Sequence, residues 1–224
     1  MGKQKHIVIY SHGAGVLKDD RGLFTYLANG LPEVESILFD YGIIDETLRT
    51  LTSRTIKEQA EMLTEIIRQT QANNPEAQID IIAHSQGAVV AALAHPQTIR
   101  KVFFVAPAFD LDINRTLDRY RDWPGTEINL DGLTRFPSIE GFMKVFPAEY
   151  WRERQSLQPF ALYNAFAEHA EITAIIAKQD HILSAVDLRE LSEKITVLSI
   201  DGDHEFSGAA RQSLLDTIRP LILE

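Results

Sequence analysis

Ser85 lies where the sequence could present a hydroxyl group as a nucleophile. The stretch Ile79–Ala83 is apolar and rich in β-branched residues, which predicts a buried strand. Ala88–Ala94 is built from small and apolar residues and predicts a helix that is buried on most sides. The chain must therefore reverse sharply at Ser85. Unpaired N–H groups and the positive dipole at the start of the helix could stabilise an oxyanion beside this hydroxyl.

Small residues flank this turn on both sides. Ala83 and Gly87 precede and follow Ser85 by two positions, so they would let the strand and the helix approach closely. The alternative interpretation is that Ser85 only caps the helix that follows it.

Asp180 and His204 are the two further groups that could take part in such chemistry. Asp180 closely follows a predicted strand at Glu171–Ala177, and His204 closely follows another at Ile195–Ile200. The carboxyl ends of parallel strands meet at one edge of a sheet, so we expect these side chains to converge with Ser85. The imidazole could then accept the serine proton, and the carboxylate could orient the imidazole.

The segment Ala83-His84-Ser85-Gln86-Gly87 resembles the nucleophile elbow of the α/β-hydrolases, usually written G-x-S-x-G, with alanine in place of the first glycine. The chain order Ser85, Asp180, His204 is also the order of that family. Within the family, the chain looks most similar to monoglyceride-lipase-like and serine-aminopeptidase-like esterases with a short lid. The resemblance implies a Ser-Asp-His catalytic triad.

The loop Ser11–Gly15 follows the first predicted strand and contains two glycines. It is similar to the His-Gly-x-Gly oxyanion loop of the same family. The resemblance implies an oxyanion hole formed by the backbone N–H groups of Ala14 and Gln86. A phosphate-binding loop is the competing interpretation, but neither the Lys-Ser/Thr pair nor the G-x-G-x-x-G spacing is present. His12 is expected to hold the loop in place.

Several other polar residues compete for roles in this site. His181 is a rival base and Asp110 a rival acid, and we favour His204 and Asp180 over them. His84 is expected to pack beside the turn. Asp201 and Asp203, near His204, are expected to shape their loop. The charged turn Lys18–Gly22 is expected to lie on the solvated surface.

Strands and helices alternate along most of the chain, which predicts an α/β fold with a mostly parallel sheet of about six strands. The remaining predicted strands are His6–Tyr10, Ser36–Tyr41 and Lys101–Ala106. The remaining predicted helices are a short one around Leu23–Leu27, a long amphipathic one at Thr52–Gln71, a short one at Val186–Leu191 and a closing one around Leu214–Leu221.

The segment 109–166 interrupts the alternation and holds 11 of the 19 aromatic residues of the chain. The resemblance implies a helical lid inserted into a single hydrolase domain that spans 1–224. Aromatic residues of a lid would line an acyl pocket, and the candidates are Trp123, Phe136, Phe142, Phe146, Tyr150 and Trp151. Of these, the candidate substrate-binding residues are Trp123, Phe142, Phe146 and Trp151. The alternative is that they form the small core of the lid itself.

Composition limits the partners of this chain of 224 residues. The formal net charge of -10 argues against nucleic acid and against docking on anionic membranes. There are no cysteines, which excludes disulfides and thiolate catalysis. No metal-ligand spacing is present, and we expect no cofactor. Without an apolar leader or a run long enough to span a bilayer, we expect a cytoplasmic protein with no stable membrane insertion.

These observations together predict a carboxylesterase-type serine hydrolase that acts on a small-molecule ester through an acyl-enzyme. A thioesterase, lactonase or amidase would use the same triad. A non-catalytic binding module on the hydrolase fold is an alternative of a different class. The acyl chain length and the oligomeric state are not determined by the sequence.

Overall fold

The structure is a computed structural model that describes residues 4–182 and 187–224. Its main sheet has six strands in the order β10-β9-β6-β5-β1-β2, and every pairing between neighbours is parallel. Its strands are β1 (His6–Ser11), β2 (Glu35–Leu38), β5 (Gln78–His84), β6 (Lys101–Val105), β9 (Glu171–Ala177) and β10 (Ile195–Ile200). The prediction of a mostly parallel sheet of about six strands is confirmed.

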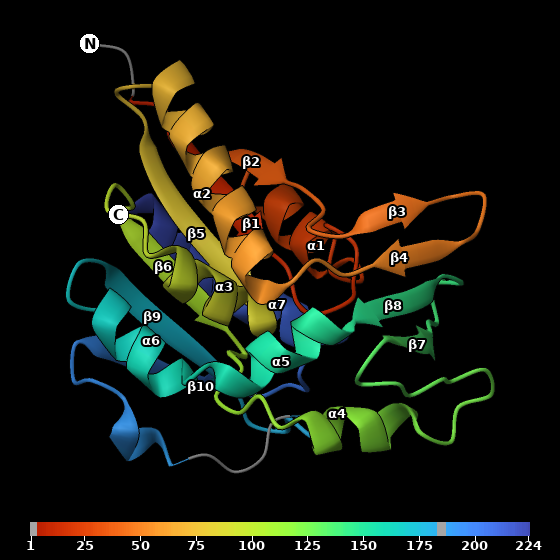
Figure 1. Cartoon of the computed structure of the whole chain (residues 1–224). Coiled ribbons are helices and arrows are strands. Elements are labelled where there is room, and N and C mark those ends of the chain that lie inside the picture. The colour runs from red at the N-terminus through yellow and green to blue at the C-terminus, as the bar shows by residue number, and fades with distance from the viewer. Residues whose placement is uncertain (1–3, 183–186) are drawn as a thin grey trace.

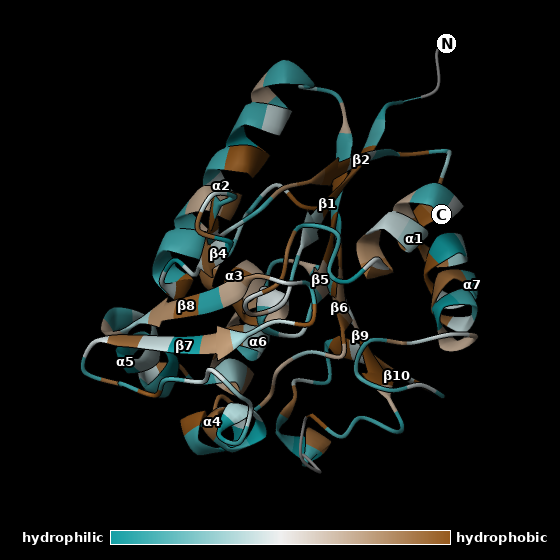
Figure 2. Cartoon of the chain, turned by 90° about the vertical axis from the view of Figure 1, so that its right-hand side faces the viewer, coloured by the Kyte–Doolittle hydropathy of each residue, from teal (hydrophilic) through white to brown (hydrophobic). Residues whose placement is uncertain are grey.

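Helices cover both faces of this sheet, as Figures 1 and 2 show. One face carries α2 (Ile56–Asn73), α3 (Gln86–Ala94) and α6 (Pro159–Phe166), and the other carries α1 (Leu23–Gly30) and α7 (Ala210–Leu223). Helix α5 (Ala148–Ser156) packs against α2 and β8. Alternate residues of each central strand point to opposite faces, so Ile7 and Ile9 pack in one core while Val8 and Tyr10 pack in the other. Burial on both faces explains why these strands read as continuous apolar runs.

The order of the strands reverses between β1 and β5. The chain leaves β1 toward β2 on one side, and then returns across β1 to form β5 on the other side. In open α/β sheets, ligands bind at the carboxyl ends of the strands beside such a reversal. The loop after β1 and the turn after β5 therefore flank the expected binding crevice.

A second sheet of four strands lies beside the main one, in the order β3-β4-β8-β7. Its strands are β3 (Ile43–Asp45), β4 (Thr50–Thr52), β7 (Leu133–Pro137) and β8 (Met143–Pro147). Two of them belong to the aromatic-rich segment 109–166, which also contains α4 (Ile113–Tyr120). The parallel pairing of β8 with β4 attaches this segment to the chain between β2 and α2.

The second sheet is not predicted from the sequence. Its strands are short, and isolated three- to five-residue runs carry too little periodicity to be recognised. Helix α6 lies over the main sheet, where Tyr163 and Phe166 pack on Phe104 of β6. The aromatic-rich segment therefore contains strands as well as helices, and part of it belongs to the main core.

Most predicted elements match the observed ones to within a few residues. The short helix predicted at Val186–Leu191 is reduced to a single 3₁₀ turn at Leu188–Glu190, and Val186 lies outside the described residues. No helix in the described part of the chain is both long and apolar enough to cross a bilayer.

The turn between β5 and α3 holds Ser85 in a rarely populated backbone conformation, with φ 53° and ψ -121°. At this turn, the start of α3 packs closely against the backbone at the end of β1. A Cβ added at Gly87 would lie 2.0 Å from the carbonyl oxygen of Ser11, a backbone atom that cannot move aside alone. Glycine at this position is therefore required by the approach of α3 to β1.

We expect Gly87→Ala to lower the free energy of unfolding by at least about 3 kcal/mol, because the added methyl group overlaps backbone in a packed core. The measurement is urea unfolding followed by circular dichroism. Gly208→Ala is the matched control: its φ is +60°, and its added Cβ meets nothing within 4 Å. The control should lose only about 1 kcal/mol. Equal losses would contradict the role given to the Gly87–Ser11 approach.

Candidate active site

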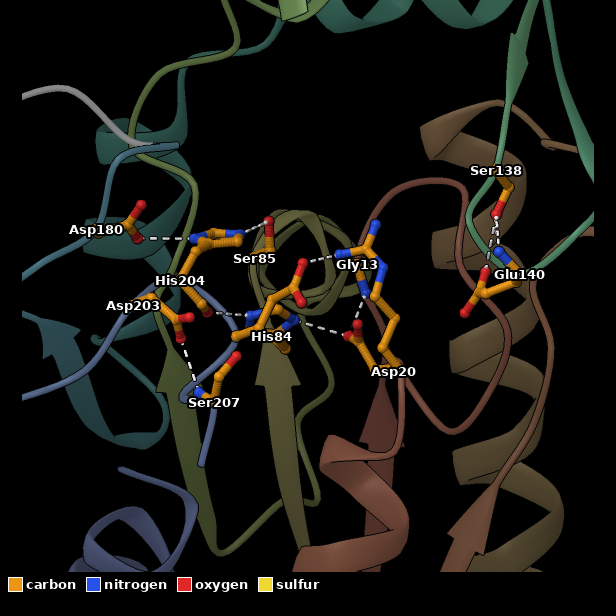
Figure 3. Close-up of polar contacts among 12 residues, drawn as sticks. Gly13, Asp20, His84, Ser85, Ser138, Glu140, Asp180, Asp203, His204 and Ser207 are labelled. Carbon is orange, nitrogen blue, oxygen red and sulfur yellow. Dashed lines mark hydrogen bonds and ion pairs between the residues drawn. The ribbon is translucent and has the colours of Figure 1, made fainter. Parts of the chain in front are cut away.

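Ser85, His204 and Asp180 meet at the carboxyl edge of the main sheet (Figure 3). The Oγ atom of Ser85 lies 2.9 Å from Nε2 of His204, and Nδ1 of His204 lies 2.7 Å from Oδ2 of Asp180. Because a carboxylate can only accept, Nδ1 carries the proton and Nε2 is left to accept the serine hydroxyl proton. A hydroxyl, an imidazole and a carboxylate in this order could act as nucleophile, base and orienting acid.

The imidazole of His204 is kept neutral by its surroundings. Burial lowers its pKa below the ordinary 6.5, and the charge of the neighbouring His84 acts in the same direction, against the opposing effect of Asp180. A neutral imidazole is the form that can accept a proton from Ser85. The group is therefore in its basic form at neutral pH.

Two backbone N–H groups beside Ser85 have no acceptor among the described residues, and they belong to Ala14 and Gln86. Gln86 is the first residue of α3, where the N–H groups have no partner within the helix. Both residues line the same cavity as Ser85. The pair could donate hydrogen bonds to an oxygen that becomes negatively charged during a reaction.

His84 and Asp20 form a second histidine–aspartate pair directly beside the first. Nδ1 of His84 lies 2.7 Å from Oδ2 of Asp20, and the same oxygen accepts a hydrogen bond from the N–H of Gly13 at 2.9 Å. Nε2 of His84 lies 2.8 Å from the backbone carbonyl oxygen of His204. The expectation that Asp20 lies in a solvated turn is wrong, since its exposed fraction is 2%.

Both ring nitrogens of His84 face atoms that can only accept hydrogen bonds, so both must donate and the ring carries a positive charge. Burial alone would lower the pKa of His84, but the charge and the hydrogen bond of Asp20 raise it above 6.5. Burial alone would raise the pKa of Asp20, but His84 holds it at about 2. The pair is an imidazolium–carboxylate ion pair in the interior.

The rival residues occupy other places. Asp110 pairs with Arg115 and makes no contact with His204. The exposed side chain of His181 is not part of the hydrogen-bonded chain. His12 holds the loop after β1 as predicted: it bonds to the carbonyl oxygen of Gly13, and it accepts the N–H of Tyr41. Asp203 accepts the N–H of Ser207 and thereby shapes its own loop (Figure 3).

The cavity above Ser85 receives several side chains from the segment 109–166. Two of the four predicted substrate-binding aromatics, Phe146 and Trp151, line it. Trp123 lines only an adjoining hollow. Phe142 lines neither space. The guanidinium group of Arg49 lies over the ring of Phe142 instead, with Cζ 4.4 Å from the ring centre. The rings of Phe146 and Trp151 also contact each other, with their centres 5.3 Å apart, so these residues serve both as pocket wall and as a local core.

The polar contacts that the segment 109–166 makes in the cavity are not predicted from the sequence, although Tyr150 is a candidate for the cavity wall and does line it. Arg154 and the hydroxyl of Tyr150 both donate to Oε1 of Gln86, at 3.0 and 2.5 Å, and so fix the residue next to Ser85. Lys144, on β8, is buried in the wall of the cavity. Its one sequence signal is a lysine inside the apolar run from Phe142 to Phe146, which does not reveal where the strand lies.

The parallel order of the strands, the turn at Ser85 and the site at the strand ends together define the α/β-hydrolase fold. No protein-family model matches the chain, and no curated protein matches it in sequence.

Solved structures share its architecture. The chain is similar to Est1E from Butyrivibrio proteoclasticus, solved with bound ferulic acid, with a TM-score of 0.72 and 14% identity over 98% of this chain and 89% of that one. It is similar to the esterase Pf2001 from Pyrococcus furiosus, with a TM-score of 0.65 and 15% identity over 98% and 80%. It is also similar to the peroxisomal α/β-hydrolase Lpx1 from Saccharomyces cerevisiae, with a TM-score of 0.61 and 14% identity over 98% and 77%.

We expect Asp20→Asn to lower the free energy of unfolding at pH 7 by about 3–5 kcal/mol, because it removes one partner of a buried ion pair. Urea unfolding measures the loss. Asp19→Asn is the matched control, since Asp19 lies in the same turn and its carboxylate makes no hydrogen bond or ion pair with a described residue. The control should change stability by no more than about 0.5 kcal/mol.

The loss should depend on pH in a defined direction. The pKa of Asp20 is depressed from 3.8 to about 2, so its contribution to stability is present above pH 3.8 and disappears as the pH falls through 2. The difference between wild type and Asp20→Asn should therefore shrink on acidification. A difference that stays constant down to pH 2 would contradict the ion pair.

Proposed function

We propose that this chain is a serine hydrolase that cleaves carboxylic esters through an acyl-enzyme intermediate. The hydrogen-bonded chain from Ser85 through His204 to Asp180 is the observation that carries the proposal. Similarity in fold to known esterases, including one solved with ferulic acid, also supports it. Because a shared fold does not determine function, the geometry of these three side chains supports the proposal more strongly than the similarity in fold does.

The mechanism follows from the positions of the protons. His204 accepts the hydroxyl proton as Oγ of Ser85 attacks the carbonyl carbon, and it then donates this proton to the leaving alcohol. Asp180 holds the required tautomer and stabilises the imidazolium that forms. The N–H groups of Ala14 and Gln86 donate to the developing oxyanion. Water repeats the sequence on the acyl-enzyme and releases the acid.

The segment 109–166 acts in this proposal as a cap that contributes Phe146 and Trp151 to the acyl side of the cavity. Tyr150 and Arg154 of α5 hold the side chain of Gln86, and so keep its backbone in place beside Ser85. The cap therefore supports the oxyanion site as well as the binding of substrate.

We expect wild-type protein to react covalently with a fluorophosphonate probe, and Ser85→Ala to abolish both this labelling and the hydrolysis of p-nitrophenyl acetate. The loss in kcat should be on the order of 10⁶ because the nucleophile is removed. Gel fluorescence and absorbance of p-nitrophenol are the measurements. Ser207→Ala is the control, since its hydroxyl lies outside the hydrogen-bonded chain, and it should label like wild type. A wild-type protein that does not label would favour a binding module.

The pH profile should report the neutral state of His204. Its pKa lies below 6.5, and the base must be unprotonated, so kcat/KM should be full above that pKa and fall as the pH drops through it. We expect the acid midpoint of log kcat/KM against pH to lie below 6.5 for a neutral ester. A midpoint above 6.5 would contradict the site electrostatics derived from burial and from the charge of His84.

A further inference from the structure

The charge of the catalytic cavity is opposite to that of the whole chain. The formal net charge of the chain is -10. The cavity wall nevertheless contains more cationic side chains than carboxylates among the described residues. The cations are Arg21, Arg115, Arg119, Lys144 and Arg154, and the carboxylates are Asp20, Asp110 and Asp112.

Two of these carboxylates have a cationic partner, and two of the cations have a carboxylate partner. Asp20 pairs with His84, Asp110 with Arg115, and Arg21 with Glu205, which lies next to His204. Lys144 differs, because it makes no hydrogen bond or ion pair with any described residue. Arg154 is also buried without a counter-ion, but it donates to neutral oxygens such as Oε1 of Gln86. Among the described residues of the wall, Lys144 is therefore the buried cation that has neither a counter-ion nor a hydrogen-bond acceptor.

The ammonium group of Lys144 is held in place with little exposure. The exposed fraction of the residue is 4%, and its Cδ packs close to Gly15 of the loop after β1. Its Nζ lies 5.9 Å from the ring centre of Tyr120. Burial lowers the pKa of Lys144 to about 8, and the nearby charge of Arg21 acts in the same direction. The carboxylates of Glu140, Asp20 and Glu205 act against this shift from a distance, since none of them forms an ion pair with Nζ. A buried ammonium without a partner is costly, and a bound anion would remove that cost.

The space next to Lys144 fits a compact group. The cavity volume is about 100 Å³, well below the roughly 300–1,000 Å³ of sites for drug-sized ligands. Arg21, Arg119 and Lys144 also line the adjoining hollow, of about 180 Å³. The carboxylate of Glu205 also lines this hollow, but it is paired with Arg21. Arg119 and Lys144 remain as cations along the path of an entering anion, which favours its approach.

We propose that the substrate is an ester that carries a carboxylate, and that Lys144 binds this carboxylate while Ser85 attacks the ester carbonyl. This inference rests on the hydrolase function proposed above and specifies its substrate class. Lys144 is a specificity-determining residue here: the carboxylate stays bound to Nζ and unchanged. The acyl carbon forms a bond to Oγ of Ser85 as the bond to the alcohol breaks and the alcohol leaves. Water then attacks the acyl carbon, which releases the acid and restores the Ser85 hydroxyl.

A pair of esters of the same shape tests the charge directly. Monomethyl glutarate and methyl 5-methylhexanoate differ by a carboxylate in place of an isopropyl group, and both are assayed at pH 7, where Lys144 is protonated. Wild type should prefer the charged ester. In Lys144→Met, the ratio of the two kcat/KM values should fall by about 10–100-fold, the range expected for a lost charge-assisted hydrogen bond.

Two further variants control for folding and for general charge. Lys144→Arg keeps the charge and should retain a preference for monomethyl glutarate. Lys57→Met removes an exposed lysine of α2, away from the cavity, and should leave the ratio unchanged. Wild type without a preference for the charged ester, or equal losses for both esters in Lys144→Met, would overturn the carboxylate site. Ester hydrolysis itself would still stand.

Binding to the Ser85→Ala protein separates the two proposals, because it needs no turnover. Tighter binding of monomethyl glutarate than of its uncharged isostere, weakened in Ser85→Ala/Lys144→Met, would support the site even if neither ester is hydrolysed. No difference in binding would overturn it. Inorganic phosphate is a competitor in the same titration: displacement of the ester by phosphate at lower concentration than by glutarate would overturn the choice of a carboxylate.

Discussion

The structure of the site depends on the buried ion pair between Asp20 and His84. One oxygen of Asp20 accepts hydrogen bonds from both the loop after β1 and the ring of His84, and that ring donates in turn to the loop that carries His204. Three segments that are distant in sequence are thus held by one charged pair. Because both charges are buried, neither can leave the other without a large cost in free energy. The pair therefore restricts how far these loops can move apart.

The same pair affects the chemistry through its charge. The positive ring of His84 lies next to His204 and repels a second positive charge there. Its charge and burial both disfavour protonation of His204 in the resting protein. The carboxylate of Asp20 acts in the opposite direction, but it contributes less than His84 does. The residue before the nucleophile thus has two roles: it ties the loops together, and it tunes the proposed base that takes the proton from Ser85.

The main sheet and the residues at its edge could be predicted because their signals are local. Apolar runs identify the strands, and a serine between a strand and a helix identifies the turn. The ends of parallel strands then bring Asp180 and His204 to the same edge. The second sheet could not be predicted, since its strands are short and pair across distant parts of the chain, as β4 does with β8. Asp20 was misjudged for a related reason. In sequence it is one of several charged residues in a turn, and only the position of His84 shows that it is buried.

The pairing of β8 with β4 explains how an inserted segment can supply well-placed groups to the site. Lys144 and Phe146 both lie on β8, and this strand is held by hydrogen bonds on both sides, from β4 and from β7. Helix α5 follows directly and brings Tyr150 and Arg154 to Gln86. Side chains on a paired strand and on a helix are placed more precisely than side chains on a free loop. The wall formed by β8 and α5 is therefore held by strand pairing and by helix contacts, although it comes from a different part of the chain than Ser85. Because Tyr150 and Arg154 also contact Gln86, substitutions elsewhere in the segment 109–166, such as at Lys144, can change the charge of the cavity while these contacts beside Ser85 remain.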